Sequence, residues 1–306
     1  HGTLTFTEIK SKKGNVITFE IPVNDKYSKI TAKGFKKNTY TVTVPVSATG
    51  LDISKSGANT VTHGSNFSFT VTKKTGYTKA TPVVKVDGTQ VVASSTSGNT
   101  YTYTISNVTG NKTVTIDNMP IDTYNVNYSL GTGVSKASGT ATAVQYGGTA
   151  TVKIDVDGAH NQVTSLPISV SNGTISGETK SGNTFTYTLS DVTADTTVKV
   201  GDLTINKYNV NIPTDRTGLE IGNGGSHTVN YDGSWTFTVK VLDGYTQSVP
   251  NVKVNNKTDG FSRTFDESTN KYTYKIDNIR ETKNVTIDNL ELNKYKYDFS
   301  TGEGYT

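Results

Sequence analysis

Tyr40-Thr-Val-Thr-Val-Pro45 is the stretch that decides the fold, because it recurs three more times along the 306-residue chain. The copies begin 84 (124 − 40), 84 (208 − 124) and 87 (295 − 208) residues apart. This even spacing indicates a tandem array of one repeated unit. The copies are Tyr124-Asn-Val-Asn-Tyr-Ser129, Tyr208-Asn-Val-Asn-Ile-Pro213 and Tyr295-Lys-Tyr-Asp-Phe-Ser300.

A second marker has the same spacing and sets the repeat boundaries. It begins 26 residues before Tyr40 (40 − 14), Tyr124 (124 − 98), Tyr208 (208 − 182) and Tyr295 (295 − 269), for example as Gly98-Asn-Thr-Tyr-Thr-Tyr103. Both ends therefore fall within a repeat, and we expect the chain to be an excerpt from a longer protein. The predicted domains are the C-terminal part of a preceding repeat (1–39), repeat 1 (40–123), repeat 2 (124–207), repeat 3 (208–294) and the start of a further repeat (295–306).

The composition of the repeat favours strands. Each unit is long enough to form its own small core. Tyr, Val, Ile, Phe and Thr are abundant, with one Met in the whole chain, and no helical spacing of apolar residues extends over ten residues. We predict an all-β fold of seven-strand, immunoglobulin-like β-sandwich modules, with an open barrel as the alternative closure of the sheet. The strands expected in repeat 1 are Thr39 to Pro45, Asn59 to His63, Asn66 to Lys73, Pro82 to Val86, Thr89 to Val92, Thr100 to Ser106 and Lys112 to Asp117.

Comparison of the repeats predicts which side chains face the core. Alternate strand positions keep apolar residues in every copy, while Thr, Lys, Asn and Ser lie between them. The lone Trp235 takes the place of Phe67 and is interpreted as a core residue, the alternative being an exposed platform for a sugar. The predicted inward sets are Val42, Val126 and Val210; Phe69, Val152 and Phe237; Val71, Ile154 and Val239; Tyr103, Tyr187 and Tyr274; Ile105, Leu189 and Ile276; and Val114, Val198 and Val285.

Repeat 2 departs from its neighbours after Asp157-Gly158. Pro167 stands nine positions after Gly158 (167 − 158), whereas Pro82 stands six positions after Gly76 (82 − 76). The apolar phase also changes after the proline, so we expect a bulge or register change near Leu166 and Pro167.

The junctions between repeats are short and lack a Gly/Ser run. Each has an apolar residue five positions before the next Tyr, namely Phe35, Met119, Leu203 and Leu290. We therefore expect a packed contact at each boundary between repeats. Such contacts predict a semi-rigid rod whose three modules reach on the order of 110 Å.

Charge and cysteine content exclude several functions. The net charge of +4 comes from Lys residues interspersed with acids, with only three Arg, so a nucleic-acid partner is not expected. No apolar run is long enough to insert into a membrane. The absence of Cys excludes disulfides and thiolate chemistry. We expect a soluble, monomeric segment.

Residues for catalysis are scarce. His63, His160 and His227 fall at different places in their repeats, and no catalytic triad or carboxylate pair can be assembled, so we predict no enzyme and no catalytic residue. Asp155-Val-Asp157-Gly158 lacks the later ligands of a calcium loop, so no metal or other cofactor is predicted. Lys-to-Asn or Lys-to-Asp isopeptide bonds are an alternative for Asp117-Asn118 and Asp288-Asn289, which end the last strands.

The candidate binding residues lie in a hairpin of repeat 3, between Lys257 and Lys271. This segment holds the three extra residues of the 87-residue unit and places Phe261, Arg263 and Phe265 at alternate positions. Aromatic residues and Arg dominate binding hot spots. The alternative is that the two Phe rings cap the core of a longer hairpin.

The strings His63-Gly-Ser-Asn-Phe-Ser-Phe-Thr-Val71 and Gly76-Tyr-Thr78, with the two repeated markers, resemble immunoglobulin-like repeats of large cell-surface proteins of Gram-positive bacteria. The resemblance covers nearly the whole chain and implies an extracellular location, cell-wall attached or secreted. It implies a non-enzymatic, adhesin-like segment that presents binding surfaces to a host protein such as immunoglobulin or a mucosal glycoprotein.

A sharper form of this expectation is a resemblance to bacterial superantigens, which bind antibody variable domains outside the antigen site. Repetition suits that role because linked weak sites gain avidity. The alternatives are a pure structural stalk and carbohydrate-binding accessory modules of a secreted glycosidase. An exposed sheet edge favours a protein partner, whereas exposed aromatic platforms favour a sugar.

Overall fold

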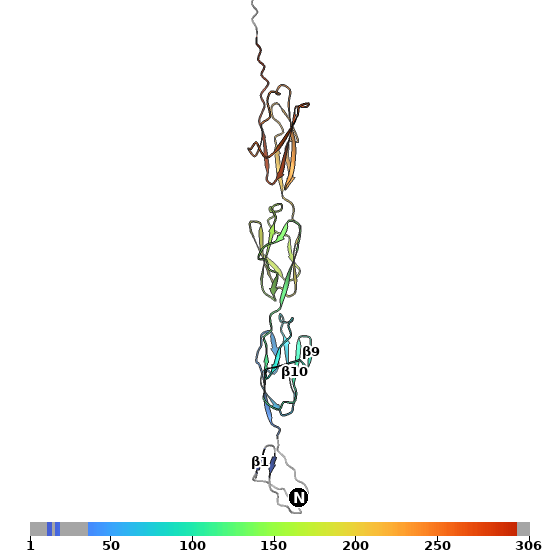
Figure 1. Cartoon of the computed structure of the whole chain (residues 1–306), viewed down its shortest axis with the longest axis vertical. Helices are drawn as coiled ribbons and strands as arrows, with labels where there is room; N and C mark the ends of the chain where they lie inside the picture. The colour runs from blue at the N-terminus through green and yellow to red at the C-terminus, as the bar shows by residue number, and fades with distance from the viewer. Residues whose placement is uncertain (1–10, 14–15, 19–35, 299–306) are drawn as a thin grey trace, which may run out of the picture. The chain divides into compact units, whose positions relative to one another are not determined.

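A computed structural model describes residues 11–13, 16–18 and 36–298, and all the regular structure in them is β-strand (Figure 1). These residues accordingly contain no helix that could cross a membrane. The chain divides into two compact units between Pro120 and Ile121. In the first unit, β1 (Ser11–Lys13) and β2 (Val16–Thr18) form an antiparallel pair. The predicted partial repeats 1–39 and 295–306 lie largely outside the described residues.

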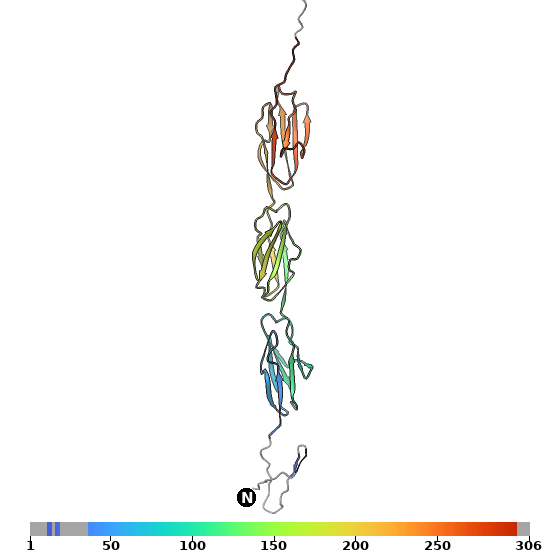
Figure 2. The same ribbon diagram turned by 90° about the vertical axis from the view of Figure 1, so that its left-hand side faces the viewer.

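Each of three modules consists of two packed sheets. The modules can be told apart by colour in Figures 1 and 2. The first module (residues 39–119) lies in the first unit, and the second (residues 123–203) and third (residues 207–290) lie in the other. The first module contains β3 (Thr39–Val44), β4 (Leu51–Ile53), β5 (Gly57–Thr62), β6 (Phe67–Lys73), β7 (Val84–Val86), β8 (Thr89–Val91), β9 (Ser95–Ser97), β10 (Thr100–Ile105) and β11 (Lys112–Ile116).

The other two modules have eight strands each. The second contains β12 (Thr123–Leu130), β13 (Val134–Lys136), β14 (Ala143–Gln145), β15 (Ala150–Val156), β16 (Ile168–Val170), β17 (Thr174–Ser181), β18 (Thr184–Ser190) and β19 (Thr196–Val200). The third contains β20 (Lys207–Ile212), β21 (Leu219–Gly222), β22 (Gly225–Asn230), β23 (Gly233–Val241), β24 (Val252–Val254), β25 (Ser262–Asp266), β26 (Lys271–Ile279) and β27 (Lys283–Ile287).

The strand order is that of an immunoglobulin-like sandwich. In the third module one sheet has the order β22-β20-β27-β24 and the other β21-β23-β26-β25. The first strand pairs in parallel with the last in every module, as β3 with β11, β12 with β19 and β20 with β27, while the other pairs are antiparallel. The strands of each module thus form two separate sheets with an apolar layer between them. This arrangement confirms the predicted all-β, immunoglobulin-like class and excludes the open barrel.

The predicted inward positions form three cores, one in each module. Phe69, Val152 and Phe237 are at most 2% exposed and belong to different clusters of buried residues. The other predicted sets are buried as well, except that Ile105 is only partly buried at the edge of its cluster. Alternation of apolar and polar residues therefore identified the core face of each strand.

The predicted number of seven strands per module is too low, since the structure has nine, eight and eight. The additional strands in the first module are β4 and β9, and each is three residues long. Length alone does not explain this, because β7 and β8 are also three residues long and were predicted. β9 has no apolar residue whose alternation could reveal it.

The bulge or register change predicted near Leu166 and Pro167 is not present, and a tight turn lies there instead. The Ile168 N–H donates to the Leu166 carbonyl oxygen at 2.8 Å, which closes a turn around Pro167. The following strand keeps the pairing of its equivalents, because Val170 lies opposite Val198 as Val86 lies opposite Val114. The β-bulge itself lies elsewhere, in β17 between Ser176 and Thr179.

The apolar residues of the junctions complete the core of the module that precedes them. Met119 and Leu290 are buried in the clusters of the first and third modules, and Leu203 packs against that of the second. Phe35 lies outside the described residues. A side-chain oxygen next to each of these residues accepts a main-chain N–H from Thr49, Thr132 or Thr217, at 2.7, 2.7 and 3.0 Å. Asn118, Asp202 and Asn289 thus anchor the end of each module to its first loop.

The buried tyrosines predict a loss of stability in alkali. Burial raises the pKa of the Tyr103, Tyr187 and Tyr274 phenols above the usual value of 10.0. An unfolded Tyr ionises near about pH 10, while these phenols stay protonated in the folded state. Their stabilising contribution is fully present below about pH 10 and is lost as the pH rises through the raised folded values. Urea midpoints should fall between about pH 9 and about pH 11, and less so in Tyr187→Phe; an equal fall in that variant would contradict this assignment.

Candidate functional site

The predicted binding residues lie on β25, the outermost strand of its sheet. Arg263 stands opposite Tyr274 on β26, and Phe265 stands opposite Tyr272. Residues directly opposite each other share one face of a sheet, and both tyrosines point into the core. The structure therefore brings the side chains of Arg263 and Phe265 to the inner face of the sheet, at its outer edge.

An aromatic and cationic cluster results at this edge. Phe265 is 45% exposed, and its ring stacks on Tyr272 with ring centroids 4.3 Å apart. The Arg263 guanidinium lies 5.5 Å from the centre of the Tyr272 ring, within the range of a cation–π contact. Phe261 is half-buried and meets Tyr274 edge-on at 5.6 Å. Phe261 thus packs against the core, as the alternative interpretation expects, whereas Arg263 and Phe265 remain at the surface.

Arg263 differs from the other two arginines in lacking an acceptor. Arg280 forms a double hydrogen bond with Asp232, at 2.6 and 3.1 Å. Arg216 donates to the carbonyl oxygens of Ile287 and Asp215. Within residues 36–298, no carboxylate forms an ion pair with Arg263, so its charge is available to a ligand.

The Tyr274 hydroxyl is the second unsatisfied group at this edge. Tyr274 is 1% exposed, and its hydroxyl has no acceptor for its proton in the described part of the chain. Burial raises the pKa of this phenol, whereas Arg263 lowers it, both by donating toward the hydroxyl oxygen and through its positive charge. A buried hydroxyl without a partner costs about 1–3 kcal/mol, so the site keeps an unsatisfied polar atom at its base.

In the second module, the tyrosine hydroxyl at the equivalent position has a hydrogen-bond acceptor. Tyr187, the equivalent of Tyr274, donates its hydroxyl to the Glu178 carboxylate at 2.5 Å. Glu178 comes from β17, the outermost strand that corresponds to β25, and lies where Arg263 lies in the third module. Burial and this bond together raise the pKa of the Tyr187 phenol. The third module thus has a cation in the place of this carboxylate.

Removal of the carboxylate should create the same defect in the second module. Glu178→Ala leaves the Tyr187 hydroxyl buried without an acceptor, and we expect it to lower the free energy of unfolding by about 1–3 kcal/mol. The measurement is urea unfolding of the intact chain. Adding Tyr187→Phe should recover most of the loss, because the orphaned hydroxyl is then absent; a double variant as unstable as Glu178→Ala would contradict this account.

The outermost strands of the three modules differ in how they block further pairing. In the first module β9 is only three residues long and lies beside β10 at the edge of its sheet (Figure 1). In the second, β17 has a bulge at Gly177, and Lys180 folds back onto the carbonyl oxygens of Asn161 and Val163. Short strands, bulges and lysines are common means of preventing edge pairing. By contrast, β25 pairs regularly over five residues without a bulge or a proline, and its charged residues are Arg263 and Asp266.

Trp235 is a partly buried residue of the third module. Its ring packs against the core cluster and stacks on His227, with centroids 4.1 Å apart and planes at 20°. The indole N–H is buried and has no partner in the described residues. The ring is covered by His227 on one side, so the packing interpretation describes it better than an open sugar platform.

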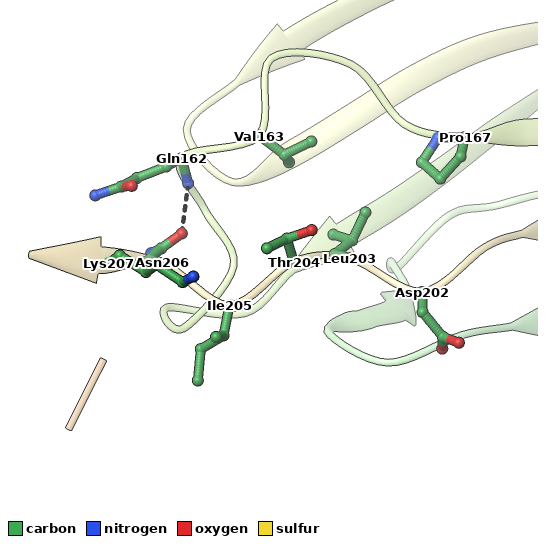
Figure 3. A pocket seen from close by; sticks show the side chains of 9 residues that line it. All are labelled: Gln162, Val163, Pro167, Asp202, Leu203, Thr204, Ile205, Asn206 and Lys207. Atoms are coloured by element: carbon green, nitrogen blue, oxygen red, sulfur yellow. Dashed lines mark hydrogen bonds between the residues drawn. The ribbon is translucent and has the colours of Figure 1, made fainter. Parts of the chain in front are cut away.

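A groove of about 500 Å³ lies in the second unit between the loop 162–167 and the segment 202–207 (Figure 3). Leu203 points toward Pro167 across it, while Asp202 and Ile205 point away from the loop (Figure 3). The Thr132 main-chain N–H lowers the pKa of Asp202 by donating to its carboxylate. The other ionisable residue of the lining, Lys207, lies at the opposite end of the groove from Asp202 (Figure 3), so the two do not form a catalytic pair.

Asn206 joins the two walls of the groove through hydrogen bonds. Its side-chain oxygen accepts from the Gln162 N–H at 3.2 Å, and its N–H donates to the Ala159 carbonyl at 2.7 Å. Asn293 makes the same two bonds in the third module, with Gln247 and Gly244. A bonding pattern that repeats at the end of successive modules indicates a structural role.

The histidines occupy separate structural positions. His160 is buried beneath the first loop of its module, with Nδ1 2.7 Å from an Asp157 oxygen. His63 lies in the first module, 3.3 Å from the Tyr40 hydroxyl, and His227 stacks on Trp235 in the third. Within residues 36–298, no three His, Asp or Glu residues are grouped as metal ligands.

Comparisons with known proteins provide no family for the chain. No family model matches it, and no curated protein does. Among solved structures, it is similar to the "Crystal structure of I9-I11 tandem from titin", with 11% sequence identity, 71% of this chain and 85% of that chain covered, and a TM-score of 0.15. The immunoglobulin-like class rests on the strand order and registers described above.

Proposed function

We propose that the chain is a non-enzymatic repeat segment of a bacterial surface protein, which extends and presents binding surfaces and engages a host protein. Three separate cores support this proposal, because each module can display its outer surface without help from a neighbour. Because a fold alone does not imply a function, the proposed binding role rests on the site in the third module. The semi-rigid rod stays a prediction, as do the extracellular location and the monomeric state.

The observation that carries the proposal is the contrast between the three outermost strands. Those of the first and second modules are short or bulged, whereas β25 is regular and has an exposed Phe265 and an Arg263 without a carboxylate. Arg and aromatic side chains are enriched at the centre of protein interfaces. A host protein such as immunoglobulin or a mucosal glycoprotein is therefore the proposed partner, with the superantigen-like mode as its sharper form.

The test is direct capture by the intact chain. The chain is immobilised, and immunoglobulin G, immunoglobulin A, mucin and a panel of free oligosaccharides are passed over it in surface plasmon resonance. We expect at least one of the protein probes to bind saturably. Binding of oligosaccharides alone would support the carbohydrate-binding accessory function instead, and no binding of any probe would support the pure stalk.

A further inference from the structure

We propose that β25 of the third module pairs with an extended acidic segment of a partner protein, whose carboxylate lies against Arg263 where the Glu178 carboxylate lies in the second module. This inference rests on the proposed function, since it specifies the chemistry of the partner and the strand that receives it. Four features of the third module lead to it: an open edge, an unpaired cation, an unsatisfied hydroxyl and an exposed ring.

The edge comes first, because it determines the shape of the partner. An outermost strand presents a row of main-chain N–H and C=O groups, and an extended peptide binds by adding a further strand to it. Only one neighbour, β26, pairs with β25. Its regular register over Ser262–Asp266 provides a continuous template, which β17 lacks because of its bulge.

The charge determines which residue the partner presents. A guanidinium binds a carboxylate through two parallel N–H bonds, the strongest type of hydrogen-bonded pair in proteins. Arg263 lacks such a carboxylate within residues 36–298, whereas Lys271 on the next strand stands opposite Asp266 of β25 itself. An Asp or Glu side chain on the inner face of an added strand would lie beside Arg263.

The Tyr274 hydroxyl makes the acceptor specific. In the second module the buried phenol donates to Glu178, an acceptor supplied by the chain itself. In the third module the phenol has no acceptor, and the residue at the position of Glu178 is a cation. A ligand carboxylate would satisfy both groups, since Arg263 is exposed and free to turn outward as the carboxylate approaches the phenol.

Phe265 determines what kind of side chain the partner segment carries two positions from its acidic residue. Its ring is 45% exposed and is held by the stack on Tyr272, so it offers a fixed apolar surface two residues from Arg263. Alternate residues of a strand share a face. The partner segment therefore places an apolar or aromatic residue two positions from its acidic residue.

A second copy of this chain fits the site less well. An antiparallel pair of β25 strands centred on Thr264 places Arg263 opposite Phe265 of the other copy and Ser262 opposite Asp266. Neither Arg263 then has a carboxylate directly opposite it. Charge complementarity therefore favours an acidic partner.

The probes are two synthetic peptides in an extended sequence, Thr-Val-Thr-Glu-Thr-Val-Thr-Val, in which a Val lies two positions from Glu on each side, and the same peptide with Gln in place of Glu, titrated into the intact chain by calorimetry and NMR. The Glu peptide should bind with at least roughly tenfold higher affinity than the Gln peptide, and added salt should reduce that difference. Equal affinities, or no binding of either peptide, would overturn the proposal.

Three variants locate the site. Arg263→Glu reproduces the Glu178 arrangement, so it should keep the fold, bond to Tyr274 and lose the preference for the Glu peptide. Tyr274→Phe removes one donor and should weaken the Glu peptide several-fold without destabilising the module. Arg280→Gln, which alters an arginine already paired with Asp232, is the control and should bind like the unchanged chain. A preference for Glu that persists in Arg263→Glu would exclude this site.

Two further results separate this inference from the proposed function. Capture of a host protein that is undiminished in Arg263→Glu would overturn the inference and leave the proposed function standing. Failure of every protein probe, with the Glu peptide still bound at Arg263, would overturn the proposed function alone. Concentration-dependent dimerisation that Arg263→Glu abolishes would assign the edge to a second copy and would also overturn the inference.

Discussion

Phe237→Ala should lower the free energy of unfolding of the third module by about 3–5 kcal/mol and leave the first and second modules unchanged. The Phe237 ring is fully buried and stacks on Tyr274 at 5.1 Å. Its removal leaves a cavity between the two sheets. Trp235, the only tryptophan in the chain, packs against the same core, so its fluorescence in a urea titration reports this module selectively.

Two variants serve as controls for this result. Thr236→Ala changes an exposed residue on the same strand and should cost less than about 1 kcal/mol. Phe69→Ala makes the equivalent cavity in the first module and should leave the Trp235 transition where it was. A shift of that transition by Phe69→Ala would show that the cores are coupled.

Gly218→Ala should destabilise the third module by on the order of 3 kcal/mol. Gly218 has φ +81°, a left-handed conformation that costs an alanine about 1–2 kcal/mol. A Cβ there would also lie 2.5 Å from Cδ1 of Tyr245, so the ring would have to move. The lower entropy of the unfolded alanine chain offsets only about 0.4–1 kcal/mol of this cost.

Gly260→Ala separates the two contributions. Its φ of +82° is nearly the same, but nothing lies within 4 Å of the position that a Cβ would occupy. Urea unfolding followed by Trp235 fluorescence should show a loss of about 1 kcal/mol for Gly260→Ala and a clearly larger loss for Gly218→Ala. Equal losses would mean that the contact with the Tyr245 ring contributes nothing.

The glycine at the position of Gly218 in each module also explains the role of His160, which the sequence did not reveal. Gly50 and Gly218 lie beneath the rings of Tyr77 and Tyr245, and Gly133 lies beneath His160 in the same way. His160 therefore takes the place of the tyrosine in the motif Gly76-Tyr-Thr. His160 stands six positions after Ile154 (160 − 154), as Tyr77 stands six positions after Val71 (77 − 71), so the spacing does pair the two residues. The motif hid this pairing, because a histidine replaces the tyrosine and Gly158 lies two positions before it instead of one.

The core was predictable because strand periodicity is a local property. Val42, Val126 and Val210 recur at a fixed step, and burial on one face follows directly from alternation. The short β9 was missed because Ser95–Ser97 contains no apolar residue and therefore no alternation. The closure of each sandwich depends on which strands pair, which is a non-local property.

The candidate site was found only in part for the same reason. Composition singled out Phe261, Arg263 and Phe265, and their binding role stays a prediction. Cross-strand register was needed to see that Arg263 faces Tyr274 and occupies the position of Glu178. The repeats differ in length at this hairpin and at the bulge, so sequence alignment alone could not match Glu178 with Arg263.

The central claim, that each module closes its own core and leaves its outer surface free, is tested most directly by disrupting the middle module. Val152→Asp places an unpaired charge where the side chain is fully buried, which should unfold the second module. Hydrogen–deuterium exchange of the intact variant should show loss of protection in β12 to β19 alone, with β3 to β11 and β20 to β27 protected as before. Loss of protection across all three modules would contradict the account.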